Sequence, residues 1–170
     1  FWKEFAIGER GFDDASVAKA VVIAAVGSLP CIFAAGKMLE TFGRHRGASV
    51  IFGVTSIATV ACYSLHGFWP LTIALMGGIF GASAVLTVLT TYTLELFPTH
   101  LRAGAFAWAN NLLGRIGYVI APPLVGAAAG EVGWGLAVSC TAVFPLIALA
   151  LILTRLPETR GKELEELQQA

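Results

Sequence analysis

Long apolar runs separated by short polar segments make up most of the sequence. A membrane-spanning helix needs about 17 to 25 mostly apolar residues to cross the hydrocarbon core. We therefore predict five spanning helices, at residues 15–36, 48–65, 71–91, 103–128 and 134–154. Residues 1–14 mix aromatic and charged side chains and are expected to form an outer loop. Residues 37–46 are expected to form a short basic loop, and residues 155–170 a polar tail.

The composition fits this pattern. Hydrophobic residues make up 56% of the chain and charged residues 13%, and the mean hydropathy is +0.76. A soluble domain has about 25% charged residues. The predicted fold class is therefore all-α integral membrane, a bundle of five transmembrane helices. The formal net charge is zero, which argues against a nucleic-acid partner.

Catalytic or metal-binding patterns are not found in the predicted spans. Cys31, Cys62 and Cys140 each lie alone in a different apolar run, so no disulfide, metal site or cofactor is predicted. No span carries a nucleophile beside a base, which disfavours an integral membrane enzyme. No span contains a carboxylate either, so a proton-coupling acid would have to lie outside this sequence.

Basic residues predict the orientation of the bundle. Lys and Arg are enriched in the cytoplasmic loops of membrane proteins. One side of the predicted bundle holds seven of them, and the other side three: Lys37, Arg44, Arg46, Arg102, Arg155, Arg160 and Lys162 against Lys3, Arg10 and Lys19. We therefore expect a multi-pass protein of the plasma membrane with a cytoplasmic C-terminus. The chain begins with Phe1 and shows no signal segment, so we also expect it to be a fragment of a longer protein.

Small residues and prolines predict local features of two spans. The third span contains Gly77-x-x-x-Gly81, a spacing that lets two membrane helices approach closely, although it often occurs by chance. The fourth span contains Pro122 and Pro123, which lack a backbone N–H and are expected to bend the helix.

Polar residues inside the third and fourth spans are candidates for the lining of a hydrated pathway. In the fourth span they are spaced three, four and three apart, which places them on one face of a helix: Trp108, Asn111, Arg115 and Tyr118. Thr87 and Thr91 share one side of the third span with Ser83 and Thr90. Two other readings stay open. Hydroxyls at this spacing often bond their own helix backbone, and Arg115 could belong to a structural ion pair.

Charged residues of the predicted cytoplasmic loops form a second candidate site. Their signs alternate between neighbouring loops, so pairing between the loops is plausible. The members of this cytoplasmic charge network are Glu40, Arg44, Arg46, Glu95, Arg102, Glu158 and Arg160.

Three of these loops also carry a resemblance. Residues 36–46 (GKMLETFGRHR) resemble the cytoplasmic GxxxDRxGRR motif of the major facilitator superfamily, with Glu40 in place of the usual Asp, Thr41 in place of a basic residue and His45 in the second basic pair. Residues 95–102 (ELFPTHLR) resemble the loop between its tenth and eleventh helices. Residues 157–161 (PETRG) resemble the signature that follows the twelfth helix of sugar porters.

The resemblance implies a fold and a function. It implies helices eight to twelve of a twelve-helix fold, with helix seven and the N-terminal half of the protein missing from this sequence. It further implies a secondary active transporter that moves a sugar or an organic acid by alternating access, as a proton symporter. The expected partners are the lipid bilayer, the missing N-terminal half, a small solute and protons. In this family the loop charges tie the helix ends together in the outward-facing state. The alternative is an oligomeric membrane channel or scaffold without a transport cycle.

Overall fold

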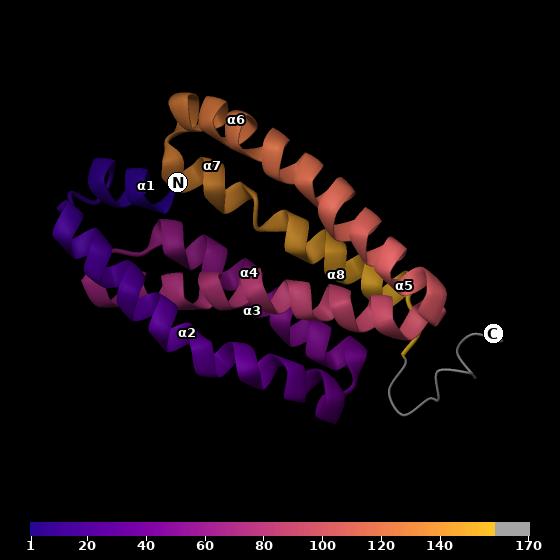
Figure 1. Ribbon diagram of the computed structural model, residues 1–170. Coiled ribbons are helices and arrows are strands. Elements are labelled where there is room, and N and C mark those ends of the chain that lie inside the picture. The colour runs from indigo at the N-terminus through magenta and orange to yellow at the C-terminus, as the bar shows by residue number, and fades with distance from the viewer. Residues whose placement is uncertain (159–170) are drawn as a thin grey trace.

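The computed structural model describes residues 1–158 of the 170-residue chain. Over that range it is a bundle of helices, in the order α1 (Trp2–Gly8), α2 (Asp14–Phe42), α3 (Arg44–Ser64), α4 (Phe68–Leu96), α5 (Thr99–Phe106), the π-helix η1 (Ala107–Leu113), α6 (Gly114–Val132), α7 (Trp134–Cys140) and α8 (Val143–Arg155) (Figure 1). Five helical segments are long and apolar enough to cross a membrane. The all-α membrane fold class is therefore confirmed.

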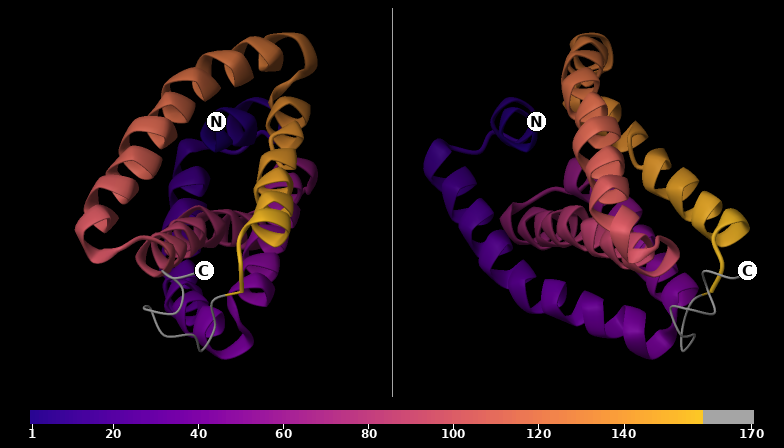
Figure 2. Two further views of the ribbon diagram at one scale, coloured as in Figure 1. Left: turned by 90° about the vertical axis from the view of Figure 1, so that its right-hand side faces the viewer. Right: turned by 45° about the vertical axis from the view of Figure 1, so that its right-hand side comes forward.

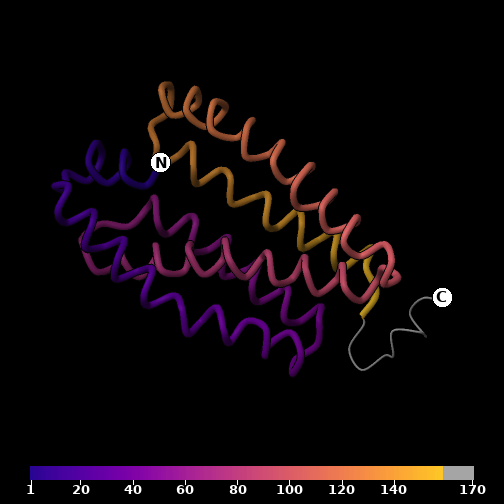
Figure 3. The backbone as a smooth tube through the Cα atoms, in the orientation of Figure 1, coloured from indigo at the N-terminus to yellow at the C-terminus, as the bar shows by residue number. Residues whose placement is uncertain are grey.

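The helices are packed unevenly. α4 packs along both α2 and α3, and α7 and α8 pack against α3. The fourth span, made of α5, η1 and α6, is one continuous rod (Figure 3). Among the described residues it meets the rest of the bundle mainly at α4, through α5, and along α7, through α6. Figure 2 shows this rod standing apart from α2.

Two apolar clusters hold the bundle together, one towards each end. At one end the cluster is built around Phe5, Cys62 and Leu71, from α1, α3 and α4. We name this end the α1 end. At the other end the cluster is built around Leu39 and Ile51, from α2 and α3. We name it the motif end, because the first two loop motifs and the described start of the third, residues 157–158, lie there (Figure 1).

The Gly77-x-x-x-Gly81 spacing marks a place where α3 and α4 approach closely. A Cβ atom added to Gly77 would lie 2.9 Å from the Cβ of Ala58, and one added to Gly81 would overlap the side chain of Thr55. Close approach needs glycine here because no larger side chain fits.

We expect Gly81→Ala to destabilise the protein by about 1–3 kcal/mol, because the added methyl group forces a well-packed interface apart. Thermal unfolding in detergent measures this loss. Gly53→Ala in α3 is the matched control, since a Cβ atom there meets nothing within 4 Å. Equal melting temperatures for the two variants would contradict the prediction.

The segment between the first two spans is helical, which corrects the expected basic loop at residues 37–46. α2 continues to Phe42 and α3 begins at Arg44, so Gly43 alone forms the turn, at a φ of +95° that favours glycine. The helix continues because Leu39 is buried in the cluster at the motif end and packs against Gly47. The polar residues here are therefore the ends of two helices.

Two further expectations need correction. Residues 1–14 were expected to form a loop, but Trp2–Gly8 is a short helix, because Trp2, Phe5 and Ala6 share a face that is buried at the α1 end. The fifth span was expected to be continuous, but it is divided between α7 and α8. Pro145 has no N–H to donate to the carbonyl of Thr141, and the N–H of Phe144 takes that carbonyl instead, at 3.1 Å. In the fourth span, helix α6 continues through Pro122 and Pro123.

Candidate functional site

An ion pair between Arg44 and Glu95 lies at the motif end. Arg44 is the first residue of α3, and Glu95 lies in the last turn of α4. The Arg44 Nε donates to Glu95 Oε1 at 3.0 Å, and Nη2 donates to the same oxygen at 2.5 Å. Nη1 donates to the carbonyl of Leu39 at 2.6 Å. Each side chain of the pair is only 15% exposed, so this charge-assisted contact is largely shielded from solvent.

Glu158 joins this pair from the end of the fifth span. Its two carboxylate oxygens accept hydrogen bonds from the backbone N–H groups of Arg44, at 2.8 Å, and His45, at 2.9 Å. The His45 ring also contacts the carbonyl of Leu156, with 2.9 Å between Nε2 and O. The first N–H groups of a helix have no partner within the helix and favour a negative charge. Glu158 therefore caps α3, and the three loop motifs meet in one place.

Three further predicted charges of this network, Glu40, Arg46 and Arg102, lie outside the contact. Glu40 and Arg46 are exposed. Arg102 donates from Nε to the carbonyl of Phe97 at 2.9 Å, which fixes the turn between α4 and α5. Arg160 lies outside the described residues. Of the seven predicted charges, the structure thus brings together Arg44, Glu95 and Glu158.

A buried hydroxyl lies close to this ion pair. Tyr92, one turn before Glu95, is 5% exposed, and its hydroxyl has no hydrogen-bond partner among the described residues. A buried hydroxyl without a partner costs stability, so it normally bonds to protein or to ordered water.

The pathway candidates of the fourth span lie on an exposed part of the bundle. Trp108 and Asn111 are in η1 and line a shallow hollow of about 240 Å³. Arg115 and Tyr118 follow in α6, and both are exposed. The π-helical turn of η1 is wider than an α-helical turn, so it shifts the register between the two halves of the predicted stripe. Turns of this kind are frequent at functional sites.

The threonines of α4 bond to their own helix. The Thr91 hydroxyl donates to the carbonyl of Thr87 at 2.9 Å, and the Thr87 hydroxyl is 3.5 Å from the carbonyl of Ser83. The sequence left open whether these hydroxyls bond to their own helix backbone. In the structure, the hydroxyls of Thr87 and Thr91 do so.

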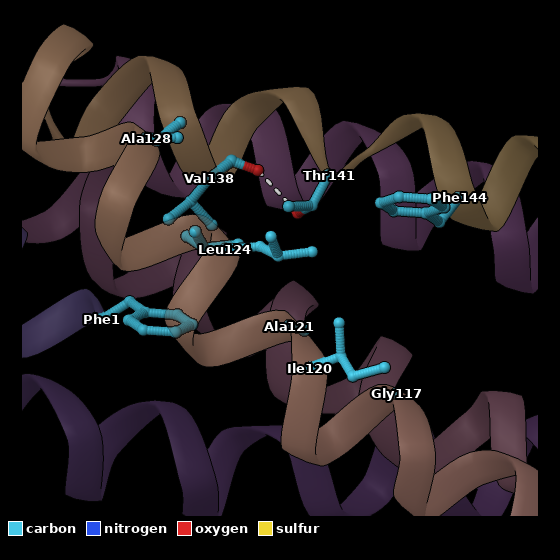
Figure 4. Close-up of a pocket in the computed structure, with 11 residues that line it drawn as sticks. Phe1, Gly117, Ile120, Ala121, Leu124, Ala128, Val138, Thr141 and Phe144 are labelled. Atoms are coloured by element: carbon cyan, nitrogen blue, oxygen red, sulfur yellow. Dashed lines mark hydrogen bonds between the residues drawn. The ribbon is translucent and has the colours of Figure 1, made fainter.

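An apolar pocket of about 600 Å³ lies between α6 and the fifth span (Figure 4). Ile120, Leu124 and Phe144 line it, and the side chain of Phe1 reaches it from the start of the chain. Thr141 also lines it, but its hydroxyl donates to the carbonyl of Val138 at 2.6 Å. A small polar solute needs several converging polar groups. The lining of this pocket is apolar instead, which favours an apolar occupant over a small polar solute.

Two functional candidates at the α1 end were missed by the sequence reasoning. The Glu9 carboxylate accepts hydrogen bonds from the backbone N–H groups of Trp134, at 2.5 Å, and Gly135, at 3.2 Å. Arg10 donates from Nε to the carbonyl of Leu65 at 3.0 Å. The only sequence signal was an acid beside a base, followed by a glycine turn at Gly11.

A separate ion pair ties α1 to α2 at the same end. Lys3 Nζ lies 2.8 Å from Asp14 Oδ1. The hydrogen bond that the Lys3 ammonium donates to Asp14 raises the pKa of Lys3 above its ordinary value. Both side chains are exposed, so the contribution of this pair to stability is small.

Comparison with known proteins agrees with this arrangement. The chain is 32% identical over 122 residues to the organic cation/carnitine transporter 2 of Arabidopsis thaliana, a match that covers 69% of this chain and 22% of that protein. It is 29% identical over 174 residues to the probable 4-methylmuconolactone transporter of Cupriavidus pinatubonensis (strain JMP 134 / LMG 1197), covering 99% of this chain and 40% of that protein. The chain thus spans less than half the length of either relative.

The family match covers nearly the whole chain. The model of the Major Facilitator Superfamily matches residues 3–169, which includes the spans, the three motifs and the segment that carries Glu9 and Arg10. The chain therefore belongs to the Major Facilitator Superfamily.

Proposed function

We propose that this chain forms helices eight to twelve of a secondary active transporter, which moves a small organic solute by alternating access. The contact among Arg44, Glu95 and Glu158 is the observation that supports this most strongly. The contact joins the start of α3, the end of α4 and the segment after α8. One conformation of the transporter can bury these charges, and another can separate them. Two discrete arrangements of such an element are what a transport cycle requires.

An organic acid is the solute class that we favour, with a sugar as the second candidate. The two relatives are named as transporters of organic cations or carnitine and of 4-methylmuconolactone. Arg115 is the pathway candidate that carries a charge, and a guanidinium binds a carboxylate through two parallel hydrogen bonds. Arginine within a membrane span usually faces a water-filled cavity or the interior of a bundle. The exposed face around Arg115 would then line a cavity completed by helices outside this sequence.

The partner of that exposed face is the N-terminal half of the same transporter. In such transporters the solute binds near the middle of the membrane, between two repeats or halves. Asn111, Arg115 and Tyr118 are exposed here, and the nearby pocket is apolar. No predicted span of this chain contains a carboxylate. If the protein is a proton symporter, its proton-coupling carboxylate therefore lies in the other half.

Uptake by the full-length protein tests this function. We expect saturable uptake of one or more small organic acids from a panel that also contains sugars, organic cations and neutral amides. We expect an uncoupler that collapses the proton gradient to abolish accumulation. Cells that carry the empty vector are the control. Ion currents without saturable uptake would favour the channel alternative and overturn the proposal.

The proposed orientation places the motif end in the cytoplasm and the α1 end outside the cell. In a full-length protein without other cysteines, we expect a cysteine at the exposed His100 to react only with reagents that enter the cell. A cysteine at the exposed Gly67, in the turn before α4, should react with a membrane-impermeant reagent added outside. The reverse pattern would place the C-terminus outside the cell.

A further inference from the structure

We propose that Glu9 and Arg10 form a clamp at the α1 end, which fixes α3 to the fifth span so that the two move as one unit during transport. The functional half of this inference rests on the proposed function. The structural half stands on the contacts of the two side chains alone.

Glu9 holds the start of the fifth span. Its carboxylate bonds to the N–H groups of Trp134 and Gly135, which are the first two residues of α7. Those N–H groups have no partner within the helix, and the helix dipole favours a carboxylate at this position. The backbone turns into α7 at Gly133, with a φ of +83°. The first turn of the fifth span thus depends on a residue 125 positions earlier in the chain.

Arg10 holds the end of α3. Its Nε donates to the carbonyl of Leu65 at 3.0 Å, and Nη2 lies 3.5 Å from the carbonyls of Tyr63 and Ser64. Carbonyls at the end of a helix lack partners within the helix and favour a positive charge. The guanidinium also lies 4.5 Å from the centre of the Phe5 ring, which holds it in place.

The clamp completes a set of links between α3 and the fifth span. At the motif end, Glu158 caps the start of α3. Midway, the buried Ser56 hydroxyl donates to the carbonyl of Ala142, at the break between α7 and α8, at 3.1 Å. Glu9 and Arg10 add the link at the α1 end. The two spans are therefore joined at both ends and in the middle, unlike the fourth span, which packs mainly against α7 and joins α4 through α5.

Residues 1–8 anchor the clamp on the bundle. Phe5 is fully buried, and Phe1 stacks on Trp134 with ring centres 5.4 Å apart. Beneath α1 lies Cys62, which is 3% exposed and belongs to the same apolar cluster. Cys62 is therefore a built-in reporter of whether the α1 end is closed.

The test measures the reactivity of Cys62 in the full-length protein, with all other cysteines, including Cys31 and Cys140, replaced by alanine. Open membrane fragments and a small water-soluble maleimide make the readout independent of transport and of orientation. We expect Glu9→Ala and Arg10→Ala each to raise the labelling rate about ten-fold. Arg10→Lys should raise it less, because lysine keeps the charge but lacks the planar set of donors. Since Arg10→Lys is mild, it also remains informative if an alanine variant does not fold.

The matched control is Glu131→Gln, because Glu131 is an exposed charge at the same end of the molecule. Its labelling rate should equal that of the parent protein. Unchanged Cys62 labelling in both the Glu9 and the Arg10 variants would overturn the clamp.

Solute uptake tests the second half of the inference. In the Glu9 and Arg10 variants we expect the maximal uptake rate per surface molecule to fall about five- to ten-fold with little change in KM, because the clamp lies away from the pathway candidates. Faster Cys62 labelling with an unchanged maximal rate would overturn the link to motion. If the parent protein transports no solute but the Glu9 and Arg10 variants still label faster at Cys62, the proposed function is contradicted. The structural half of the inference, the clamp itself, would still stand.

Discussion

Glu95→Gln in the full-length protein is expected to lower solute uptake about ten-fold with little change in surface expression. The pair with Arg44 is largely shielded from solvent, so removing the charge of Glu95 weakens a partly desolvated contact. If the contact forms when the cytoplasmic side is closed, its loss destabilises the outward-facing state relative to the inward-facing state. A ten-fold change in that equilibrium corresponds to about 1.4 kcal/mol. Initial uptake rates per surface molecule measure the effect.

Glu40→Gln is the matched control, because Glu40 is an exposed carboxylate in the last turn of α2, which also lies at the motif end. Exchanging the two charges, with Glu95→Arg and Arg44→Glu together, should restore only part of the activity. The backbone N–H of Arg44 is bonded to Glu158, so a glutamate at position 44 would stand next to a like charge. If Glu95→Gln and Glu40→Gln both transport like the parent, these charges serve only to set the topology.

Arg115→Ala is expected to have the largest effect of any single change, a loss of uptake of about 100-fold at unchanged surface expression. A loss of this size corresponds to about 2.8 kcal/mol and is reasonable for a charge-assisted contact with the solute. Arg115→Lys should recover only part of the loss, since lysine cannot form the paired hydrogen bonds of a guanidinium. Uptake at several solute concentrations separates a change in KM from a change in the maximal rate.

The control for this prediction is Arg155→Ala, because Arg155 is exposed at the end of α8, where a charge lies near the membrane surface. It should transport normally. Near-normal uptake by Arg115→Ala would favour a role at the lipid or in packing over a role in the pathway.

The spans and the meeting of the loop motifs could be predicted from the sequence. The spans follow from the length of the apolar runs, and the meeting of the motifs follows because successive loops alternate between the two sides of the membrane. Apolar runs of membrane length place every other loop on the same side, so Arg44, Glu95 and Glu158 had to lie at one end of the bundle. Which charges would touch could not be predicted. Arg102 bonds to the nearby carbonyl of Phe97, because a local partner is available without ordering another segment.

The errors have local physical causes. Polarity suggested a loop at residues 37–46, but Leu39 is buried and keeps this segment helical. The break in the fifth span depends on the amide hydrogen that Pro145 lacks. Pro145 lies inside a strongly apolar run, so the hydrophobic pattern did not indicate the break. Glu9 and Trp134 meet only because α1 folds back over the bundle, and no pattern near either residue indicates the other. Roles for the pathway candidates remain predictions, which the uptake measurements on the Arg115 variants test.

The cap on α3 also sets an order for biosynthesis. Glu95 lies 51 residues after Arg44, and Glu158 lies 114 residues after it. At a synthesis rate of about 5–20 residues per second, α3 waits roughly 6 to 23 s for the residue that caps it. Glu95 is made first, so its ion pair with Arg44 can form before the cap. A chain that stops before Glu158 would lack the cap, and the N–H groups of Arg44 and His45 would then have to bond to water or to another acceptor.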